Sequence, residues 1–232
     1  MNITVIHGSM RHGNTYHCTQ LLLEEIRAQQ ETHVTQFFLP QDMPDFCTGC
    51  FSCFLNGEET CPHYESVQPI VVAMEAADVV VLTSPVYGLD VSGQMKTLID
   101  HLCYMWMPHR PNPHMFRKIG VVVTTTAGAG LPHTAKTLNN SLSYWGFLRL
   151  FTFKKAVGAL RWEDVSSQKR AQIEQETKQL GQRVVKASRR AGQLRPRLFT
   201  RMFFNAMMQS MKNNVSNSKD RAHWQQHGWL SG

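Results

Sequence analysis

Two unbroken apolar runs constrain the fold of this chain more than any other feature. They are VVVL at 79–82 and VVV at 121–123, and each leads into a loop of small and polar residues, SPVYGLD at 84–90 and TTTAGAG at 124–130. Strands that are apolar without alternation are buried on both faces, as in a parallel sheet with helices on either side. The runs therefore predict two central strands of such a sheet.

The first 191 residues alternate between strand and helix patterns throughout. Further runs predict strands at 2–8, 33–39 and 151–160, and helical spacing predicts helices at 13–30, 67–77, 91–105, 131–146 and 163–192. Pro69 indicates the start of the second helix or a kink in it. The alternation favours an α/β protein with helices on both faces of a parallel sheet. Five strands fit the flavodoxin-like order 2-1-3-4-5, in which ligands bind beyond the carboxyl ends of the strands.

Positive charge is concentrated at the C-terminus. The net charge is +7, yet the ten Lys and Arg residues from Arg183 onward accompany a single acid, Asp220, so that residues 1–182 are close to neutral. We therefore expect a flavodoxin-like domain over 1–191 and a basic extension over 192–232. The near-neutral body argues against a nucleic-acid partner.

The basic extension carries apolar residues at helical spacing, which predicts an amphipathic helix. They are Phe199, Met202, Phe203, Ala206 and Met207. Such a helix can dock on protein or lie on an anionic membrane, and we expect docking rather than membrane contact. No signal peptide and no apolar stretch of membrane-spanning length is visible, so we expect a cytoplasmic location.

The loop GSMRHGNT at 8–15 joins the first strand to the first helix. Ser9, Asn14 and Thr15 can donate side-chain hydrogen bonds, Arg11 supplies charge, and the helix N-terminus attracts anions. This favours a site for a terminal phosphate, although the loop has neither a P-loop nor a dinucleotide-binding pattern. The alternative is an ordinary capped turn, because helix N-caps prefer the same residues.

The loops at 84–90 and 124–130 have features that suit a flat ring. Tyr87 can cover one face of a planar ring system, or it can simply cap the core. The loop at 124–130 offers backbone donors that no large side chain obstructs, or it is a flexible stretch of small residues. Because the carboxyl ends of parallel strands meet at one edge, the three loops together indicate one ligand site.

Four of the six cysteines have the spacing C-x2-C-x2-C-x7-C. They are Cys47, Cys50, Cys53 and Cys61. Three closely spaced thiolates with a fourth further along can hold a [4Fe–4S] cluster. Reduced thiols without metal, a C-x2-C pair of lowered pKa near a cofactor, a disulfide and zinc remain as alternatives.

The residues around these cysteines suggest a shielded loop. Phe46, Phe51 and Phe54 could exclude water from a cluster. The remaining cysteines, Cys18 and Cys103, lie in helical patterns, and we expect them to be buried packing residues.

These motifs resemble the flavodoxin-like NADPH-dependent FMN reductases and, within them, the iron–sulfur flavoproteins. The resemblance rests on GSMRHGNT at 8–15, CTGCFSC at 47–53 with Cys61, and SPVYGLDVSGQMKTLID at 84–100. Met10 stands where members usually have proline. The resemblance implies FMN, with Ser9, Arg11, Asn14 and Thr15 at the phosphate, Pro85, Val86, Tyr87 and Gly88 at the ring, and Thr126, Ala127 and Gly128 in the third loop. It also implies a [4Fe–4S] cluster at the four cysteines.

The activity that the resemblance implies is electron transfer. Members pass electrons from NADPH, NADH or a reduced protein donor through FMN to a flavin, quinone or other acceptor, and they are commonly oligomeric. The flavin supplies the redox chemistry, so no acid or base residue is required, and we expect His7, His12 and His101 to be packing or surface residues. The alternative is a non-enzymatic electron carrier between protein partners.

Overall fold

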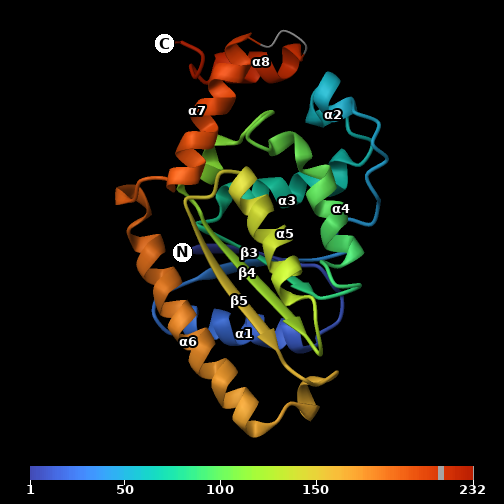
Figure 1. The fold of residues 1–232 in the computed structure, drawn as a ribbon, viewed down its shortest axis with the longest axis vertical. Coiled ribbons are helices and arrows are strands. Elements are labelled where there is room, and N and C mark those ends of the chain that lie inside the picture. Colours follow the sequence, from blue (N-terminus) through green and yellow to red (C-terminus); the bar gives the residue numbers. More distant parts are fainter. Residues whose placement is uncertain (214–216, 232) are drawn as a thin grey trace.

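A single parallel sheet organises the computed structural model, which describes residues 1–213 and 217–231 (Figure 1). The strands are β1 (Asn2–His7), β2 (His33–Phe38), β3 (Val79–Pro85), β4 (Ile119–Thr126) and β5 (Arg149–Ala156). Their order is β2-β1-β3-β4-β5, and every neighbouring pair is parallel. This confirms the flavodoxin-like order expected from the sequence.

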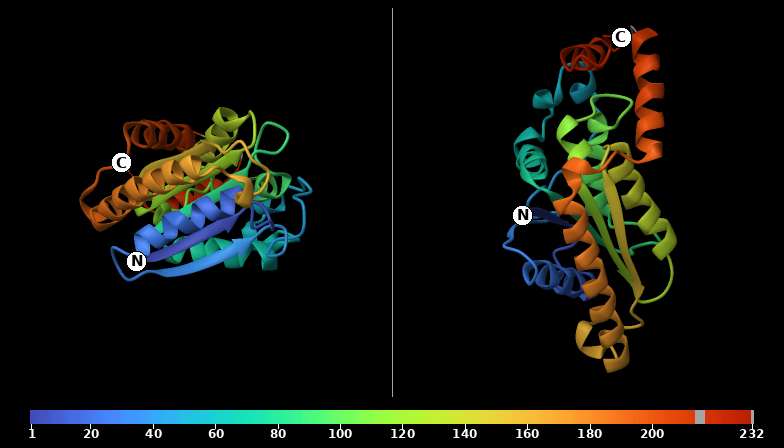
Figure 2. Two further views of the ribbon diagram at one scale, coloured as in Figure 1. Left: turned by 90° about the horizontal axis from the view of Figure 1, so that it is seen from below. Right: turned by 90° about the vertical axis from the view of Figure 1, so that its left-hand side faces the viewer.

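Helices cover both faces of the sheet (Figures 1 and 2). One face carries α1 (Asn14–Arg27) and α6 (Ser167–Arg189), and the other carries α3 (Tyr64–Ala76), α4 (Gly93–His101) and α5 (Leu131–Tyr144). Successive strand residues point to opposite faces, so Val79 and Val81 pack under α1 and α6 whereas Val80 and Leu82 pack on the other side. This double burial explains the unbroken apolar runs.

Most helices lie where helical spacing predicted them, and α3 is an exception. The residues predicted on one side of α1 (Thr15, Cys18, Leu22 and Ile26) are all buried. By contrast, α3 begins at Tyr64, so Pro69 lies inside the helix and does not start it. The earlier start is possible because the apolar stripe of α3 extends back to Val67 and the preceding turn is polar.

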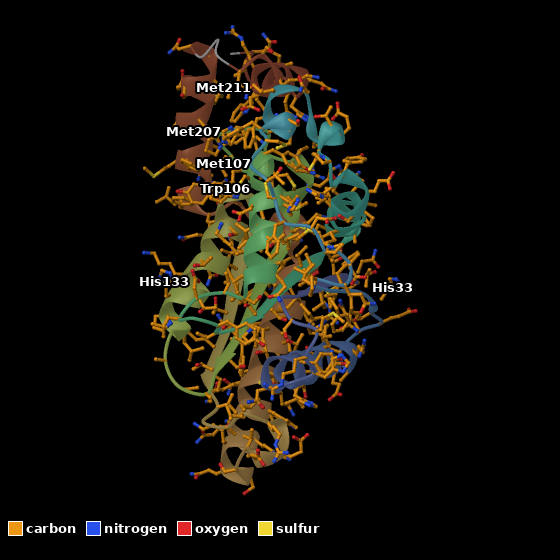
Figure 3. All side chains as sticks on the ribbon, turned by 90° about the vertical axis from the view of Figure 1, so that its right-hand side faces the viewer. His33, Trp106, Met107, His133, Met207 and Met211 are labelled. Carbon is orange, nitrogen blue, oxygen red and sulfur yellow. The ribbon has the colours of Figure 1, made fainter. Side chains whose placement is uncertain are left out.

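The C-terminal extension forms α7 (Leu198–Asn213) and α8 (Ser218–Gln226), which lie at one end of the molecule (Figure 1). Docking on protein is confirmed, because the Phe203 ring lies 5.2 Å from that of Tyr144 in α5, which in turn stacks on Trp106 at 4.9 Å. Figure 3 shows Met207 and Met211 of α7 in the same upper part of the molecule as Trp106.

The predicted apolar face of α7 is partly wrong. Phe199, Met202 and Ala206 are exposed, whereas Thr200 and Met211 are buried. The helix meets the domain along the line through Thr200, Phe203 and Met211, about a third of a turn from the predicted stripe. Spacing alone cannot choose between these overlapping stripes, because apolar residues occupy both. Among the described residues, no helix has both the length and the apolar character needed to cross a membrane.

Candidate functional site

A pocket at the carboxyl edge of the sheet brings the three predicted loops together. Its lining residues are His7, Ser9, Arg11, Gly13, Asn14, Thr15, Tyr16, Thr83, Pro85, Val86, Tyr87, Thr125, Thr126, Ala127, Ala159 and Leu160. Nine of the eleven residues expected to contact a cofactor are among them. The other two, Gly88 and Gly128, lie in the turns beside the pocket.

The first loop forms the polar end of the pocket. Gly13 precedes α1 without a side-chain cap, and the first turn contains no acidic residue. Because the first backbone N–H groups of a helix lack partners within it, this end attracts anions. The Arg11 guanidinium donates to the carbonyl oxygen of Leu160 (2.6 Å), and the Arg11 backbone N–H donates to Ser9 Oγ (3.1 Å). A positive group is thus held at an anion-binding helix terminus.

Asn14 and Thr15 connect this end to neighbouring loops. Asn14 Nδ2 donates to the carbonyl oxygen of Ala159 (2.7 Å), and Thr15 Oγ1 lies 2.6 Å from Thr125 Oγ1. Asn14 Oδ1 is buried and has no hydrogen-bond partner in the described chain. Buried acceptors are normally satisfied, so this oxygen is an acceptor at the edge of the pocket that the described chain leaves unused.

The second loop is a tight turn that presents Tyr87. The backbone N–H of Tyr87 donates to the carbonyl oxygen of Asp90 (2.9 Å), and the N–H of Asp90 donates back (3.1 Å). The two central residues, Gly88 and Leu89, have φ of 55° and 69°, which matches the two-residue turns that favour glycine. Tyr87 is 46% exposed and its hydroxyl lies 3.5 Å from Ser9 Oγ. Tyr87 is therefore a wall of the pocket and does not cap the core.

The third loop is more ordered than small residues alone suggest. The Thr126 hydroxyl donates to the carbonyl oxygen of Ala129 (2.9 Å) and accepts from the backbone N–H of Gly128 (3.1 Å). The backbone N–H of Gly128 is therefore one donor of this loop that Thr126 already uses. Gly130 brings this loop against the second one, since a Cβ there would lie 2.5 Å from Val86 Cγ1.

Several lining residues were not predicted from the sequence to contact a cofactor. His7 ends β1, where its ring nitrogens lie 3.2 Å from Thr83 Oγ1 and 2.9 Å from Gln36 Oε1. Burial lowers the pKa of His7 below its usual 6.5, which keeps the ring neutral at pH 7 and agrees with a packing role. Ala159 and Leu160 follow β5, so the rule that ligands bind beyond the carboxyl ends of strands could have included them.

The cysteines line a second cavity, at the far end of α4 from the first loop. Its lining residues are Cys47, Thr48, Gly49, Cys50, Phe51, Cys53, Phe54, Cys61, Pro62, His63, Asp100, His101 and Cys103. At the other end of α4, the Ser92 hydroxyl donates to the carbonyl oxygen of Gly8 (2.5 Å). The nine residues of α4 span about 12 Å, so the chain separates its two sites by the length of this helix.

The thiols in this cavity differ in the direction in which their pKa is shifted. The backbone N–H of Ser52 lowers the pKa of the exposed Cys50. Burial raises the pKa of Cys53, and the nearby Cys61 raises it further. Burial also raises the pKa of Cys103 to about 11. Cys18 is fully buried as expected, whereas Cys103 is only partly buried and faces the cysteine cavity, which corrects its expected packing role.

The cavity brings together the four predicted cysteine ligands, but they are not arranged as a metal site in the part of the chain that the structure describes. In residues 1–213 and 217–231, no three Cys, His, Asp or Glu side chains are arranged to hold a metal ion. The expected aromatic shield is also wrong for two residues, because Phe46 and Phe51 are 71% and 63% exposed. Residues 47–51 have no regular secondary structure, so no neighbouring element covers these two rings.

Two histidines in the cavity wall have buried Nε2 atoms without a described hydrogen-bond partner. They are His63, whose Nδ1 lies 3.4 Å from an Asp45 carboxylate oxygen, and His101, whose Nδ1 lies 2.9 Å from the Thr97 carbonyl oxygen. In each ring the partner of Nδ1 is an acceptor, so a neutral ring would carry its proton on Nδ1 and leave Nε2 as an acceptor.

Known proteins match this chain at the level of sequence. Residues 1–160 match the family described as NADPH-dependent FMN reductase. An iron–sulfur flavoprotein of Archaeoglobus fulgidus is 29% identical over 147 residues, which are 63% of this chain and 64% of that protein. An iron–sulfur flavoprotein of Methanocaldococcus jannaschii is 33% identical over 145 residues, which are 60% of this chain and 70% of that protein. The chain thus spans less than two thirds of the Archaeoglobus protein.

Solved structures share the fold at low sequence identity. A flavone reductase superposes with a TM-score of 0.62 and 14% identity, over 85% of this chain and 66% of that one. An FMN-dependent NADH-azoreductase from Bacillus anthracis, solved in complex with FMN, has a TM-score of 0.60 and 12% identity, over 80% of this chain and 100% of that one. By fold and by sequence, the chain belongs to the NADPH-dependent FMN reductase family and groups with its iron–sulfur flavoproteins.

Proposed function

We propose that this protein is an FMN-dependent oxidoreductase. It takes electrons from NADPH, NADH or a reduced protein donor and passes them to a flavin, a quinone or another acceptor. The observation that carries the proposal is the single pocket in which three carboxyl-edge loops join an anion-binding helix terminus to an aromatic wall.

The residues of the pocket suit FMN in their chemistry, with Arg11 and a helix N-terminus at one end and Tyr87 as a wall. Its phosphate would bind Ser9, Arg11, Asn14 and Thr15 together with the first backbone N–H groups of α1, and its ring would lie against Pro85, Val86 and Tyr87. Thr126 and Ala127 would line the ring's other edge, while Gly88 and Gly128 shape the turns that present these residues. Bound FMN supplies the exchange of one or two electrons, and the protein orients the ring and limits access of water.

Protein side chains have a limited role in proton transfer under this proposal. His7 lies in the pocket, but its two ring nitrogens already face Thr83 and Gln36. Because burial keeps His7 neutral at pH 7, we assign it to positioning the floor of the pocket and name no acid or base.

Steady-state assays of the purified protein test this function. With FMN bound at one per chain, we expect NADPH or NADH to be oxidised when a flavin or quinone acceptor is present. Full FMN occupancy with no oxidation of either nicotinamide, but rapid exchange with a reduced protein donor, would favour the electron carrier instead. Absence of FMN binding would contradict both functions.

We also propose a [4Fe–4S] cluster at Cys47, Cys50, Cys53 and Cys61. Support comes from their shared cavity and from relatives that are named iron–sulfur flavoproteins. Since the described side chains do not already form a metal-binding group, the proposal requires the loop to rearrange as a cluster assembles. Anaerobic purification should give about four irons and four sulfides per chain. Protein with FMN but no iron after anaerobic reconstitution would contradict the cluster.

The setting of this activity is part of the same proposal. We propose a cytoplasmic homo-oligomer built from a cofactor-binding domain over 1–191 and the basic extension over 192–232. The family match to residues 1–160 and the position of α7 and α8 outside the doubly wound sheet support this division.

A further inference from the structure

A buried ion pair joins the C-terminal helix to the core. Asp220 of α8 and Arg110, in the segment after α4, have side chains that are 3% and 7% exposed, and their charged groups lie 2.7 Å apart. The second oxygen of Asp220 lies 2.9 Å from His109 Nδ1. The two oxygens of the Asp220 carboxylate thus contact two adjacent residues, His109 and Arg110.

The same arginine holds the cysteine loop. Its other terminal nitrogen donates to the backbone carbonyl oxygen of Cys53 and lies 3.3 Å from a carboxylate oxygen of Glu58. The guanidinium also lies over the Tyr104 ring, 5.4 Å from its centre. Arg110 therefore bridges α8 to the stretch between Cys53 and Cys61, and it does so from a fixed, buried position.

Neighbouring contacts reinforce this bridge. Trp224 of α8 is fully buried, and its Nε1 donates to the carbonyl oxygen of His109 (2.6 Å). His223 Nε2 lies 3.0 Å from the carbonyl oxygen of Pro111. On the other side of the bridge, the Phe54 ring packs edge-on against His109, 4.7 Å between centres. The tail and the cysteine loop thus meet on one short segment, 109–111.

The cysteine loop has little regular structure of its own. Residues 47–51 lack regular structure, and α2 (Ser52–Leu55) has four residues. Isolated helices of this length are unstable without packing. Removal of one partner from a buried ion pair leaves an uncompensated charge in the interior, which is strongly destabilising locally. The loop therefore depends on contacts that α8 completes.

We propose that α8 is a clasp that holds one wall of the cysteine cavity in place, acting from Asp220 through Arg110 on the backbone of Cys53. The C-terminal extension then sets the exposure of the Cys53 thiol from outside the flavin pocket. Asp220 and Arg110 are positioning residues. The inference does not depend on what occupies the cavity, because thiol exposure is measurable in protein without a metal.

Alkylation of full-length, reduced, iron-free protein by iodoacetamide, followed by mass spectrometry, tests the clasp. In Asp220→Asn we expect Cys53 to react at least about ten-fold faster than in the wild type, because the cavity opens locally. Cys18 is fully buried and reports global unfolding, so its rate should not change. Cys50 is exposed and should react alike in both proteins. Asp164→Asn, which removes the exposed carboxylate that pairs with Arg161, is the matched control.

A second variant separates the bridge from tail docking. In Arg110→Lys the single ammonium can pair with Asp220 but cannot also donate to the Cys53 carbonyl oxygen, which the second terminal nitrogen of arginine does. We expect faster alkylation of Cys53 while amide hydrogen exchange in 218–226 stays close to the wild-type rate. An unchanged Cys53 rate in both variants, or equal acceleration of Cys53 and Cys18, would overturn the proposal.

Discussion

At the scale of single residues, Gly130 shows how backbone geometry shapes the pocket at the carboxyl edge of the sheet. Its φ is +95°, a conformation that side chains other than glycine rarely adopt, and a Cβ would lie 2.5 Å from Val86 Cγ1 and 2.9 Å from the backbone of Leu89. The sequence shows only a loop of small residues here. The need for glycine at this position arises from the approach of two loops that are about forty residues apart in the sequence, which no local pattern reveals.

We predict that Gly130→Ala lowers the free energy of unfolding by about 1–3 kcal/mol, because of the strained φ and the overlap with Val86. Gly128→Ala is the matched control, since Gly128 has no positive φ and open space where a Cβ would lie. Its effect should stay within about 0.5 kcal/mol. Urea denaturation of both variants measures the difference, and equal effects would contradict the assigned contact.

His7 leads to a prediction about pH at the same scale. Burial lowers its pKa in the folded protein below 6.5, so the unfolded chain binds the proton more tightly. The contribution of neutral His7 to the free energy of unfolding is therefore fully present above about pH 6.5. It is lost as the pH falls toward the pKa that His7 has in the folded protein. Denaturation of His7→Asn from pH 7.5 to 5 should show a shallower acid loss than the wild type. Parallel pH profiles would show that His7 titrates alike in both states.

At the scale of elements, sequence periodicity identifies the strands and helices but not their exact packed faces. The apolar runs and the helical stripe of α1 depend on burial that the sequence itself encodes, and both were predicted. The stripe of α7 was misassigned because Phe199, Met202, Phe203 and Met207 offer two overlapping faces. Burial of Thr200 and Met211 against the rest of the chain decides between them.

Paired substitutions on α7 test this face. We predict that Phe203→Ala, which removes the ring packed on Tyr144, lowers the free energy of unfolding by about 1–3 kcal/mol, less than for a fully buried ring. Met202→Ala, at a side chain that is 64% exposed, should change it by less than about 0.5 kcal/mol. A larger effect of Met202→Ala would indicate that another surface covers the side of α7 that is exposed in this structure.

At the scale of the whole molecule, the chain holds two cavities at opposite ends of α4 and a tail that reaches one of them. The meeting of the three loops in one pocket was predictable, because the carboxyl ends of parallel strands must meet at one edge. The position of the cysteine cavity was not, because residues 39–63 join β2 to α3 with little periodicity. The link between Asp220 and Arg110 spans half the chain and leaves no spacing signal, and Cys103 enters the cavity only through the turn after α4.

The central claim is that the first loop binds the phosphate of FMN, and one titration tests it most directly. FMN and riboflavin, which lacks the phosphate, would be titrated into cofactor-free wild-type protein and Arg11→Gln while flavin fluorescence is followed. We predict that Arg11→Gln weakens FMN binding by roughly ten- to a hundred-fold, as expected for a charged hydrogen bond, and leaves riboflavin binding unchanged. Arg161→Gln, at an exposed arginine, should behave as the wild type. Equal affinities of the wild type for FMN and riboflavin, or an equal loss of both in Arg11→Gln, would contradict the account.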